Sequence, residues 1–276
     1  MKPFRMLVVD LDGTALKWGN TLAPEDVEAA RALGEAGVHV TIATGRLYGG
    51  TKWVAGALGV RGSVAVMNGS ERIDVGDDTK LFVDALTPEQ RAATRDVLVE
   101  HGLSAFLFRS SGIHHDHADA RHTPYLGIWT PTLVGHERLV EDPVWLESND
   151  ALAIGAAGHA AVIDAAHDAL AKRMGFPLGM KKFDTFEGDR FLKVRSHTTD
   201  KGTAIGSLAA DRGLSVDEVV VVGDWLNDVP MLKVAGRSYV MGDALDEVSV
   251  HAHEKLVAKR GEGGAIAEIA RKAFGL

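Results

Sequence analysis

The chain has 276 residues, a length that allows one large domain or two modest ones. Apolar residues make up 46% of it, charged residues 25%, and the formal net charge is −8, which argues for a globular protein without a broad nucleic-acid or anionic-membrane surface. The absence of cysteine excludes disulfides, thiolate catalysis and cysteine-ligated zinc or iron–sulfur sites.

The first third of the chain alternates short apolar runs with helical patterns. Strands are predicted at 4–9, 38–45 and 63–69, and helices at 23–37 and from about 47 to 58. Strands separated by helices indicate βαβ units and a parallel sheet. Asp10 ends the first apolar run before signal-peptide length, and no later run has about 18 uncharged apolar residues, so we expect a soluble, cytoplasmic protein.

The middle of the chain has a different pattern. Two amphipathic helices are predicted at 87–102 and 159–175, and strands at 105–110, 151–156 and 191–194. This is enough chain for an α+β domain inserted between two halves of a parallel-sheet domain. We therefore expect an α/β fold with one domain built from residues 1–84 and 190–276 and a second from 85–189.

The last third repeats the pattern of the first. Helices are predicted at 200–213, 227–236 and 264–276, and strands at 218–224 and 238–243. The apolar runs in these strands are continuous, which is typical of strands covered on both faces. They are expected to complete the parallel sheet.

The sequence DLDGT follows the first strand and places Asp10 and Asp12 two residues apart. Residues at this spacing can project to the same side where the chain leaves the sheet, which is where open α/β sheets bind ligands. Two close carboxylates raise each other's pKa unless a cation neutralises them, and oxygen ligands favour Mg²⁺. Asp-Gly-Thr is also ordinary turn chemistry, so this stretch alone does not decide between a site and a capped turn.

Three further stretches carry polar groups where a strand ends or a helix begins. Thr44 and Gly45 in TGR offer a hydroxyl and tight backbone amides to phosphate oxygens. Lys201 in DKGTA lies at a helix start, where an anion is favoured. Asp224 follows an apolar strand in GDWLND, with Asn227 and Asp228 one turn later. Each has a plain structural explanation as a turn, a solvated charge or a helix cap, but their joint order favours a phosphate site.

These four stretches resemble the motifs of the haloacid dehalogenase (HAD) superfamily, and their order resembles its Cof-type phosphatases. The resemblance covers essentially the whole chain and implies a Rossmann-like core at 1–84 and 190–276 with a C2-type cap at 85–189. The segment MNGSERI is similar to one that precedes such caps.

The resemblance also implies the chemistry. Asp10 would be the nucleophile that forms an aspartyl-phosphate, and Asp12 the general acid and base. Mg²⁺ would be held by the Asp10 carboxylate, the Asp12 backbone carbonyl and the Asp224 carboxylate, while Asn227 and Asp228 support these ligands or orient Lys201. The phosphoryl oxygens would be bound by Thr44, Lys201 and the amides of Leu11, Asp12 and Gly45.

Three features stand outside this scheme. The run IHHDHADARH, from Ile113 to His122, is interpreted as a polar loop or hairpin of the cap, with a transition-metal site as the alternative and a contribution to substrate choice as a third possibility. Trp225 in GDWLND differs from the glycine that is frequent at this position in Cof-type proteins, so the resemblance does not predict the shape of the neighbouring pocket. Trp129 and Trp145 are expected in the core or at its rim, with a sugar-stacking platform as the alternative.

The leading hypothesis is therefore a Mg²⁺-dependent phosphatase of small phosphorylated metabolites, with sugar phosphates favoured, acting without nucleic-acid or membrane partners. The alternatives are a phosphosugar mutase of the same superfamily and a non-catalytic metabolite-binding protein. The sequence leaves open the physiological substrate, the cap residues that contact it and the oligomeric state.

Overall fold

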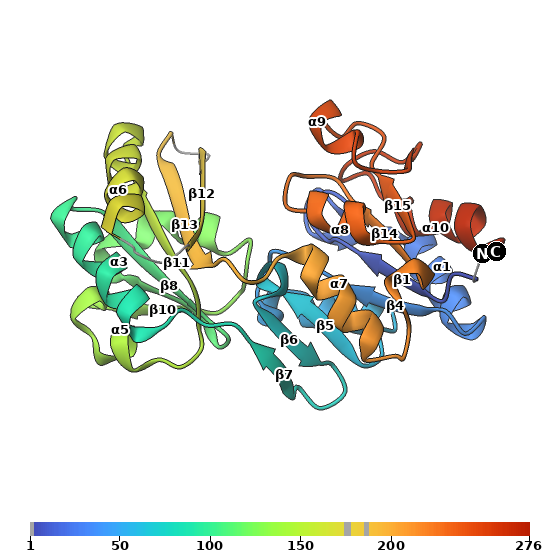
Figure 1. Cartoon of the computed structure of the whole chain (residues 1–276), viewed down its shortest axis with the longest axis horizontal. Coiled ribbons are helices and arrows are strands. Elements are labelled where there is room, and N and C mark those ends of the chain that lie inside the picture. Colours follow the sequence, from blue (N-terminus) through green and yellow to red (C-terminus); the bar gives the residue numbers. More distant parts are fainter. Residues whose placement is uncertain (1–2, 174–177, 185–187) are drawn as a thin grey trace. The chain divides into compact units, whose positions relative to one another are not determined.

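Residues 3–173, 178–184 and 188–276 are described in a computed structural model, which separates into two units (Figure 1). The core consists of the described residues of Met1–Arg46, Thr51–Phe82 and Thr199–Leu276. The cap consists of those of Leu47–Gly50 and Val83–Thr198. No helix among the described residues is long and apolar enough to cross a membrane.

The core is organised around a five-stranded parallel sheet with the strand order β16-β15-β14-β1-β4. The central strand β1 (Met6–Val9) pairs in parallel with β14 (Val219–Gly223) on one side and β4 (His39–Ile42) on the other. Strands β15 (Arg237–Val240) and β16 (Glu254–Lys255) extend the sheet beyond β14. The predicted α/β fold with a parallel sheet is thereby confirmed.

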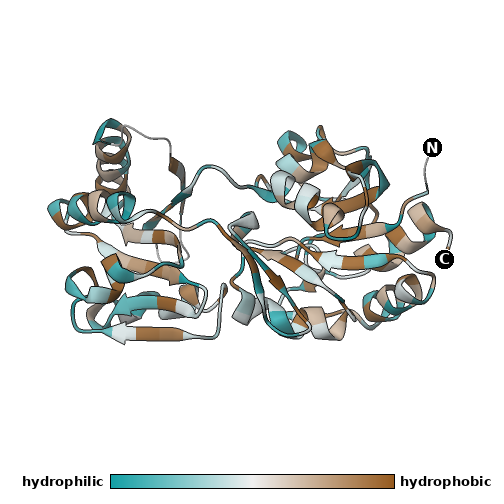
Figure 2. Cartoon of the chain, turned by 60° about the horizontal axis from the view of Figure 1, so that its bottom comes forward, coloured by the Kyte–Doolittle hydropathy of each residue, from teal (hydrophilic) through white to brown (hydrophobic). Residues whose placement is uncertain are grey.

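Burial explains why these strands are apolar along their whole length. Met6–Val9 and Val219–Gly223 are buried at every position. Helices α7 (Lys201–Ala210) and α8 (Val229–Val234) pack together and cover the side of the sheet that contains Met6 and Val8. Helix α1 (Pro24–Glu35) packs against β4 and α10 (Ala265–Ile269). Figure 2 shows brown, apolar residues along the strands, whereas the helices carry both colours.

The predicted third strand has a different role from the one expected. Strand β5 (Ser63–Val66) pairs antiparallel with β6 (Glu71–Asp74) and meets the parallel sheet only through a bridge between Ala43 and Ala65. The other core elements are the strands β2 (Leu16–Lys17), β3 (Thr21–Leu22) and β7 (Lys80–Val83) and the helices α2 (Tyr48–Ala57) and α9 (Asp246–Ser249).

The cap contains a six-stranded sheet with the order β10-β9-β8-β11-β13-β12. Its pairs are antiparallel except β9 with β10, which are parallel. The strands are β8 (Ser104–Arg109), β9 (Gly112–Asp116), β10 (Leu133–His136), β11 (Ala151–Gly158), β12 (Leu178–Asp184) and β13 (Arg190–Ser196). Strand β13 therefore extends the cap sheet past residue 189, where the sequence places the end of the inserted domain, because its apolar run forms an interior strand.

Helices cover one face of the cap sheet. Helix α3 (Pro88–Glu100) packs against α6 (Ala160–Arg173) and α5 (Pro143–Glu147), and α6 contacts β11 and β13. This layer encloses an apolar cluster in which Trp145 is completely buried, so the expected core position of Trp145 is confirmed. Part of the predicted helix at 159–175 lies outside the described residues.

The histidine-rich run was expected as a loop or hairpin. Its first part belongs to β9, which forms a hairpin with β8, and residues His117–His122 form a 3₁₀ segment before α4 (Thr123–Leu126). Strand β9 was not predicted because the side chains of His114 and His115, although polar, are buried.

Candidate active site

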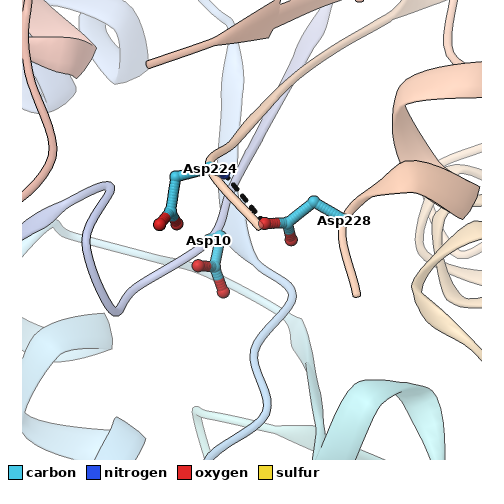
Figure 3. A group of neighbouring side chains, drawn as sticks. All are labelled: Asp10, Asp224 and Asp228. Carbon is cyan, nitrogen blue, oxygen red and sulfur yellow. Dashed lines mark hydrogen bonds between the residues drawn. The ribbon is translucent and has the colours of Figure 1, made fainter. Parts of the chain in front are cut away.

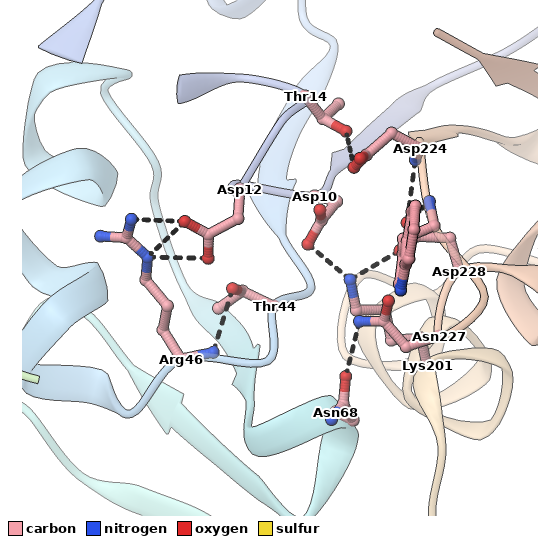
Figure 4. A network of polar contacts seen from close by, with 11 residues as sticks. Asp10, Asp12, Thr14, Thr44, Arg46, Asn68, Lys201, Asp224, Asn227 and Asp228 are labelled. Carbon is pink, nitrogen blue, oxygen red and sulfur yellow. Dashed lines mark hydrogen bonds and ion pairs between the residues drawn. The ribbon is translucent and has the colours of Figure 1, made fainter. Parts of the chain in front are cut away.

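The predicted site residues meet at one edge of the core sheet. Asp10 and Asp224 directly follow the adjacent parallel strands β1 and β14, and Thr44 lies two residues after the end of β4. The carboxyl ends of parallel strands lie at the same edge, which brings these three residues together although 214 positions separate the first from the last in the sequence. Lys201 begins α7 and reaches the same place (Figure 4).

Three buried carboxylates form the centre of the site (Figure 3). Asp10, Asp224 and Asp228 each offer an oxygen atom, and these oxygens lie within 4.8 Å of one another. Burial raises the pKa of Asp10 well above its usual range; Asp228 and Asp224 raise it further, while Lys201 opposes the shift. Burial, followed by the charge of Asp228, raises the pKa of Asp224 to about 7. The cluster therefore favours a cation.

Lys201 supplies one positive charge to this cluster. Its Nζ donates to Asp10 Oδ1 at 2.5 Å and to Asp228 Oδ1 at 2.6 Å. Burial alone would lower the pKa of Lys201, but these two carboxylates raise it well above its usual range, so the amine stays protonated. The start of α7 is fixed by a capping box in which Asp200 accepts from the Thr203 amide at 2.8 Å.

The loops that carry the carboxylates are held by polar contacts of their own. Asp228 Oδ2 accepts from the amides of Asp224 and Trp225, each at 2.9 Å, while its other oxygen is bonded to Lys201. Thr14 Oγ1 donates to Asp224 Oδ1 at 2.8 Å. Gly13 has φ +79°, and a Cβ there would lie 2.6 Å from Asp224 Oδ2. In DLDGT, the glycine therefore leaves space for the Asp224 carboxylate, and the threonine donates a hydrogen bond to it.

Asp12 points away from the carboxylate cluster and toward Arg46 (Figure 4). Arg46 Nε donates to Asp12 Oδ2 at 2.9 Å and Nη2 to Asp12 Oδ1 at 2.5 Å, and Nη1 donates to Asn20 Oδ1 at 2.7 Å. The side chain of Arg46 is only 7% exposed, whereas that of Asp12 is 46% exposed. The sequence stretch TGR contained this arginine, but no role was predicted for it.

Asn68 is a second site residue for which the sequence predicted no role. It lies beside Thr44, Gly45 and Asn227. Thr44 is fully buried, and its Oγ1 accepts from the Arg46 amide at 3.2 Å. Asn227 Nδ2 donates to Asn68 Oδ1 at 3.0 Å, and this oxygen would be 3.6 Å from a Cβ at Gly45. Asn68 has φ +57°, a left-handed conformation that asparagine tolerates better than most residues. The sequence stretch MNG, which contains Asn68 and directly follows a strand, was the feature that could have identified it.

The donor set fits a hard divalent cation. All three clustered side chains offer carboxylate oxygens, the ligands preferred by Mg²⁺, and the raised pKa values of Asp10 and Asp224 indicate that positive charge is favoured there. Because both oxygens of Asp228 already accept hydrogen bonds, Asp10 and Asp224 are the better ligands, and Asp228 orients Lys201 and the Asp224 loop.

The histidine-rich run and the side chain of Trp225 were the remaining candidates from the sequence. Among the described residues, the aspartate cluster is the group of three or more His, Cys, Asp or Glu side chains that could hold a metal ion. The histidine-rich run forms no such group within residues 3–173, 178–184 and 188–276. Trp225 is 44% exposed, and the Arg260 guanidinium lies 5.4 Å from its ring centroid.

Comparisons with known proteins show the family of this chain. A family model described as haloacid dehalogenase-like hydrolase matches residues 7–269. The Escherichia coli pyridoxal phosphate phosphatase YbhA is 26% identical over 90% of this chain and 92% of its own. An HMP-PP phosphatase of Yersinia pestis (strain Pestoides F) is 28% identical over 96% of this chain and 93% of its own.

Solved structures show the same fold. A haloacid dehalogenase-like hydrolase from Bacteroides thetaiotaomicron matches with a TM-score of 0.83 and 20% identity, covering 98% of this chain and 99% of its own. A phosphatase of the haloalkanoate superfamily from the same organism matches with a TM-score of 0.79 and 21% identity, covering 99% and 96%. Both chains align over the core and the cap, because almost the whole of each chain is covered.

Proposed function

This chain belongs to the haloacid dehalogenase-like hydrolase family, and on that premise we propose that it is a Mg²⁺-dependent phosphatase that acts through an aspartyl-phosphate on Asp10. Its curated relatives are named phosphatases, which supports hydrolysis of small phosphorylated metabolites. The observation that carries the proposal is the buried Asp10 carboxylate, held at 2.5 Å by Lys201 beside Asp224, with the ionisable Asp12 two residues later.

The proposed reaction uses Asp10 and Asp12 in turn. An Asp10 oxygen attacks phosphorus, the bond from phosphorus to the ester oxygen breaks, and Asp12 gives its proton to the leaving alkoxide. Asp12 then takes a proton from water while the water oxygen attacks phosphorus, which releases phosphate and restores Asp10. Asp12 is suited to exchange protons because it is partly exposed, while Arg46 fixes its position.

Mg²⁺ would be held by the carboxylates of Asp10 and Asp224 and the backbone carbonyl of Asp12. When bound, it would neutralise charge on the nucleophile and the phosphate and polarise the phosphoryl group. Thr14 and Asp228 support these ligands through their bonds to Asp224.

The phosphoryl oxygens would be bound by Thr44, by Lys201 and by the amides of Leu11, Asp12 and Gly45. Several donors are needed because the barrier of phosphate-monoester hydrolysis must be lowered by roughly 20 kcal/mol or more. A single positioned donor supplies about 3–4 kcal/mol.

The leaving group distinguishes the members of this substrate class. Sugar phosphates are the class favoured by the sequence, whereas two curated relatives are named for pyridoxal phosphate and HMP-PP. The phosphate chemistry of the core is compatible with all of them, so the choice depends on groups that contact the rest of the substrate.

The proposal is tested by phosphate release from p-nitrophenyl phosphate with and without Mg²⁺. Replacing the nucleophile in Asp10→Asn should lower kcat by about 10⁴-fold or more. Asp26→Asn is a matched control, because Asp26 is also buried in the core but accepts from the amides of Gly264 and Ala267 instead. It should lower stability and leave kcat within about twofold.

Full activity of Asp10→Asn, or of wild type after removal of divalent metal, would contradict the proposal. Phosphate release without an added bisphosphate activator separates hydrolysis from a mutase reaction, and any multiple turnover excludes a protein that only binds its ligand.

A further inference from the structure

A second cavity lies in the core, away from the carboxylate cluster. Its volume is about 760 Å³, which falls within the roughly 300–1,000 Å³ typical of small-molecule sites. It is lined by the C-terminal parts of α1 and α2 and by His39, the first residue of β4. All of its lining residues belong to the core. The carboxylates follow the carboxyl ends of the strands, whereas this cavity lies at the amino end of β4, so the two sites are separate.

Part of the cavity wall is apolar. Five of its apolar side chains are buried or half-buried: Val27, Ala30, Val38, Val40 and Leu58. An apolar group placed against this wall would remove more of it from water, which is favourable. The cavity therefore suits a ligand with an apolar part.

Glycines keep the cavity open where the two helices end. Gly34 lies in α1 and Gly56 in α2, and both line the cavity. A Cβ at either position would meet no atom within 4 Å, and neither residue has the positive φ that favours glycine. Glycine inside a helix costs stability relative to alanine. Since neither packing nor conformation requires glycine here, its consequence is the open space.

Basic side chains surround this cavity, although the protein as a whole has a net charge of −8. Arg31, Arg61, Arg212 and His39 line it, whereas Glu35 is the acidic residue of the lining. Positive charge gathered at a cavity of an acidic protein attracts anions to that place. The lining is therefore complementary to a ligand with negative charge.

The arginines are placed so that a ligand can reach them. Arg212 is half-buried and held in position, because its Nη2 donates to the backbone carbonyl of Arg61 and a Cβ at Gly62 would clash with that nitrogen. Arg31 and Arg61 are exposed, and within the described part of the chain neither guanidinium has an ion-pair partner. An anion can therefore bind to them without breaking an existing ion pair.

His39 experiences the same positive charge. Burial, followed by the charges of Arg212 and Arg5, lowers its pKa. The imidazole is therefore neutral at neutral pH, and its N–H group can donate a hydrogen bond. An anion beside it would favour its protonated form, so His39 adds to the complementarity of the arginines.

We infer that this cavity is a second ligand site, for a small organic anion that has a phosphate or carboxylate group on a compact apolar body. The anionic group contacts the guanidinium groups, and the apolar body covers the buried part of the wall. This site goes beyond the proposed phosphatase reaction and does not depend on it.

Both parts of the ligand contribute to this choice. An inorganic anion would fill only a small part of the cavity and leave its apolar wall in water, while a neutral apolar molecule would make no use of the arginines. The planar fork of an arginine side chain matches phosphate and carboxylate oxygens equally well in shape. The experiment therefore has to distinguish these two groups.

The experiment titrates the full chain with 8-anilinonaphthalene-1-sulfonate, a fluorescent anion with apolar rings and no phosphate ester. Arg31→Met and Arg61→Met should each raise the Kd of its tightest site by about threefold or more. Arg271→Met is the matched control, because Arg271 is also an exposed arginine of the core but does not line the cavity. Its Kd should stay within about 1.5-fold of wild type.

A second variant fills the cavity without removing a charge. Gly56→Leu places a side chain in the open space and improves the helix propensity of α2, so weaker binding would not come from unfolding. Its Kd should rise by about tenfold or more. Gly206→Leu is the control, since Gly206 lies in α7 with equally open surroundings but outside the cavity lining. Thermal unfolding verifies that both variants are folded.

Competition identifies the anionic group. Phenylphosphonate and phenylacetate share an apolar ring, and the one that displaces the probe more strongly assigns phosphate or carboxylate, while equal displacement assigns a site for either. Inorganic phosphate should displace it about tenfold less well. Displacement by neither ring compound, equal displacement by inorganic phosphate, an equal loss in Arg271→Met, or unchanged binding in Gly56→Leu would overturn the inference. None of these measurements needs turnover, so failure of the phosphatase proposal would leave them unaffected.

Discussion

The core and the cap each bury a lysine, and the two lysines are held in opposite states. Lys201 in the core is fully buried between Asp10 and Asp228, which raise its pKa and keep it charged. Lys193 in the cap lies among aromatic rings beside Arg195 and Lys181, and its pKa falls to about 7. Burial is nearly the same in both places, so the neighbouring charges decide the outcome.

This difference bears on the proposed chemistry. A phosphoryl group carries negative charge, and a permanent cation such as Lys201 suits it. Lys193 is not permanently charged near neutral pH, so the cap has no comparable fixed cation at this position.

Removing the core lysine should give the largest effect. Lys201→Met leaves Asp10 and Asp228 buried without their cation, so we expect a loss of about 3–5 kcal/mol in the free energy of unfolding. Turnover of p-nitrophenyl phosphate should fall by about 10²–10³-fold. Urea unfolding and steady-state kinetics measure both. Lys52→Met is the control, since Lys52 pairs with Asp78 on the core surface at 2.5 Å; equal stability of the two variants would contradict the comparison.

The Arg46–Asp12 pair should give the next largest effect. Arg46→Gln loses the guanidinium that fixes the proposed acid, so kcat should fall by about 10–100-fold on an alkyl phosphate such as glucose 6-phosphate. The loss should be smaller on p-nitrophenyl phosphate, whose leaving group needs less protonation, and Arg46→Lys should restore part of it. If Arg46 had a purely structural role, Arg46→Gln would instead lower kcat equally on both substrates.

Removing the cap lysine should have the opposite effect on stability. The folded-state pKa of Lys193, about 7, lies below its usual 10.5, so between these values the unfolded chain binds the proton that the folded chain lacks. Wild-type stability should rise with pH across this window. Lys193→Met should therefore be more stable than wild type at pH 7, and the gap should close as the pH approaches 10.5. Thermal unfolding across this range checks it; a lower stability of Lys193→Met at pH 7 would refute it.

The buried His114 of the cap should give the smallest effect. His114 Nδ1 is 2.7 Å from His136 Nε2, and burial, His136 and Arg109 lower its pKa from 6.5 to about 4, while Asp142 and Asp150 oppose the shift. As the pH falls from 6.5 toward 4, the unfolded chain protonates first, so stability is lost.

Acid unfolding of His114→Gln tests this sign. The variant should lose less stability than wild type between pH 7 and pH 5, because it has no imidazole to protonate. An identical acid dependence of the two proteins would show that His114 does not contribute.

Local pattern was sufficient for most of the core and for the motif residues. The continuous apolar runs at Met6–Val9 and Val219–Gly223 identified buried parallel strands, and Asp10 and Asp224 were predicted at their ends. Thr44 was predicted after the strand that the structure has at His39–Ile42. Contacts between site residues that depend on the direction of their side chains were not predicted. Arg46 and Asn68 lay in stretches already singled out, yet only the folded chain shows that one contacts Asp12 and the other Asn227.

The sequence by itself therefore determined the parallel sheet, because strand periodicity is a local property. It also predicted an inserted domain and, through the order of the motifs, the carboxylates and the lysine of the proposed site. Only the tertiary structure decided which strands join the cap sheet, that Asp228 bonds to Lys201, and that Lys193 is buried beside the rings of Phe108 and Trp129. Such contacts depend on register between distant strands and on the neighbours of each buried charge, and no local pattern encodes either.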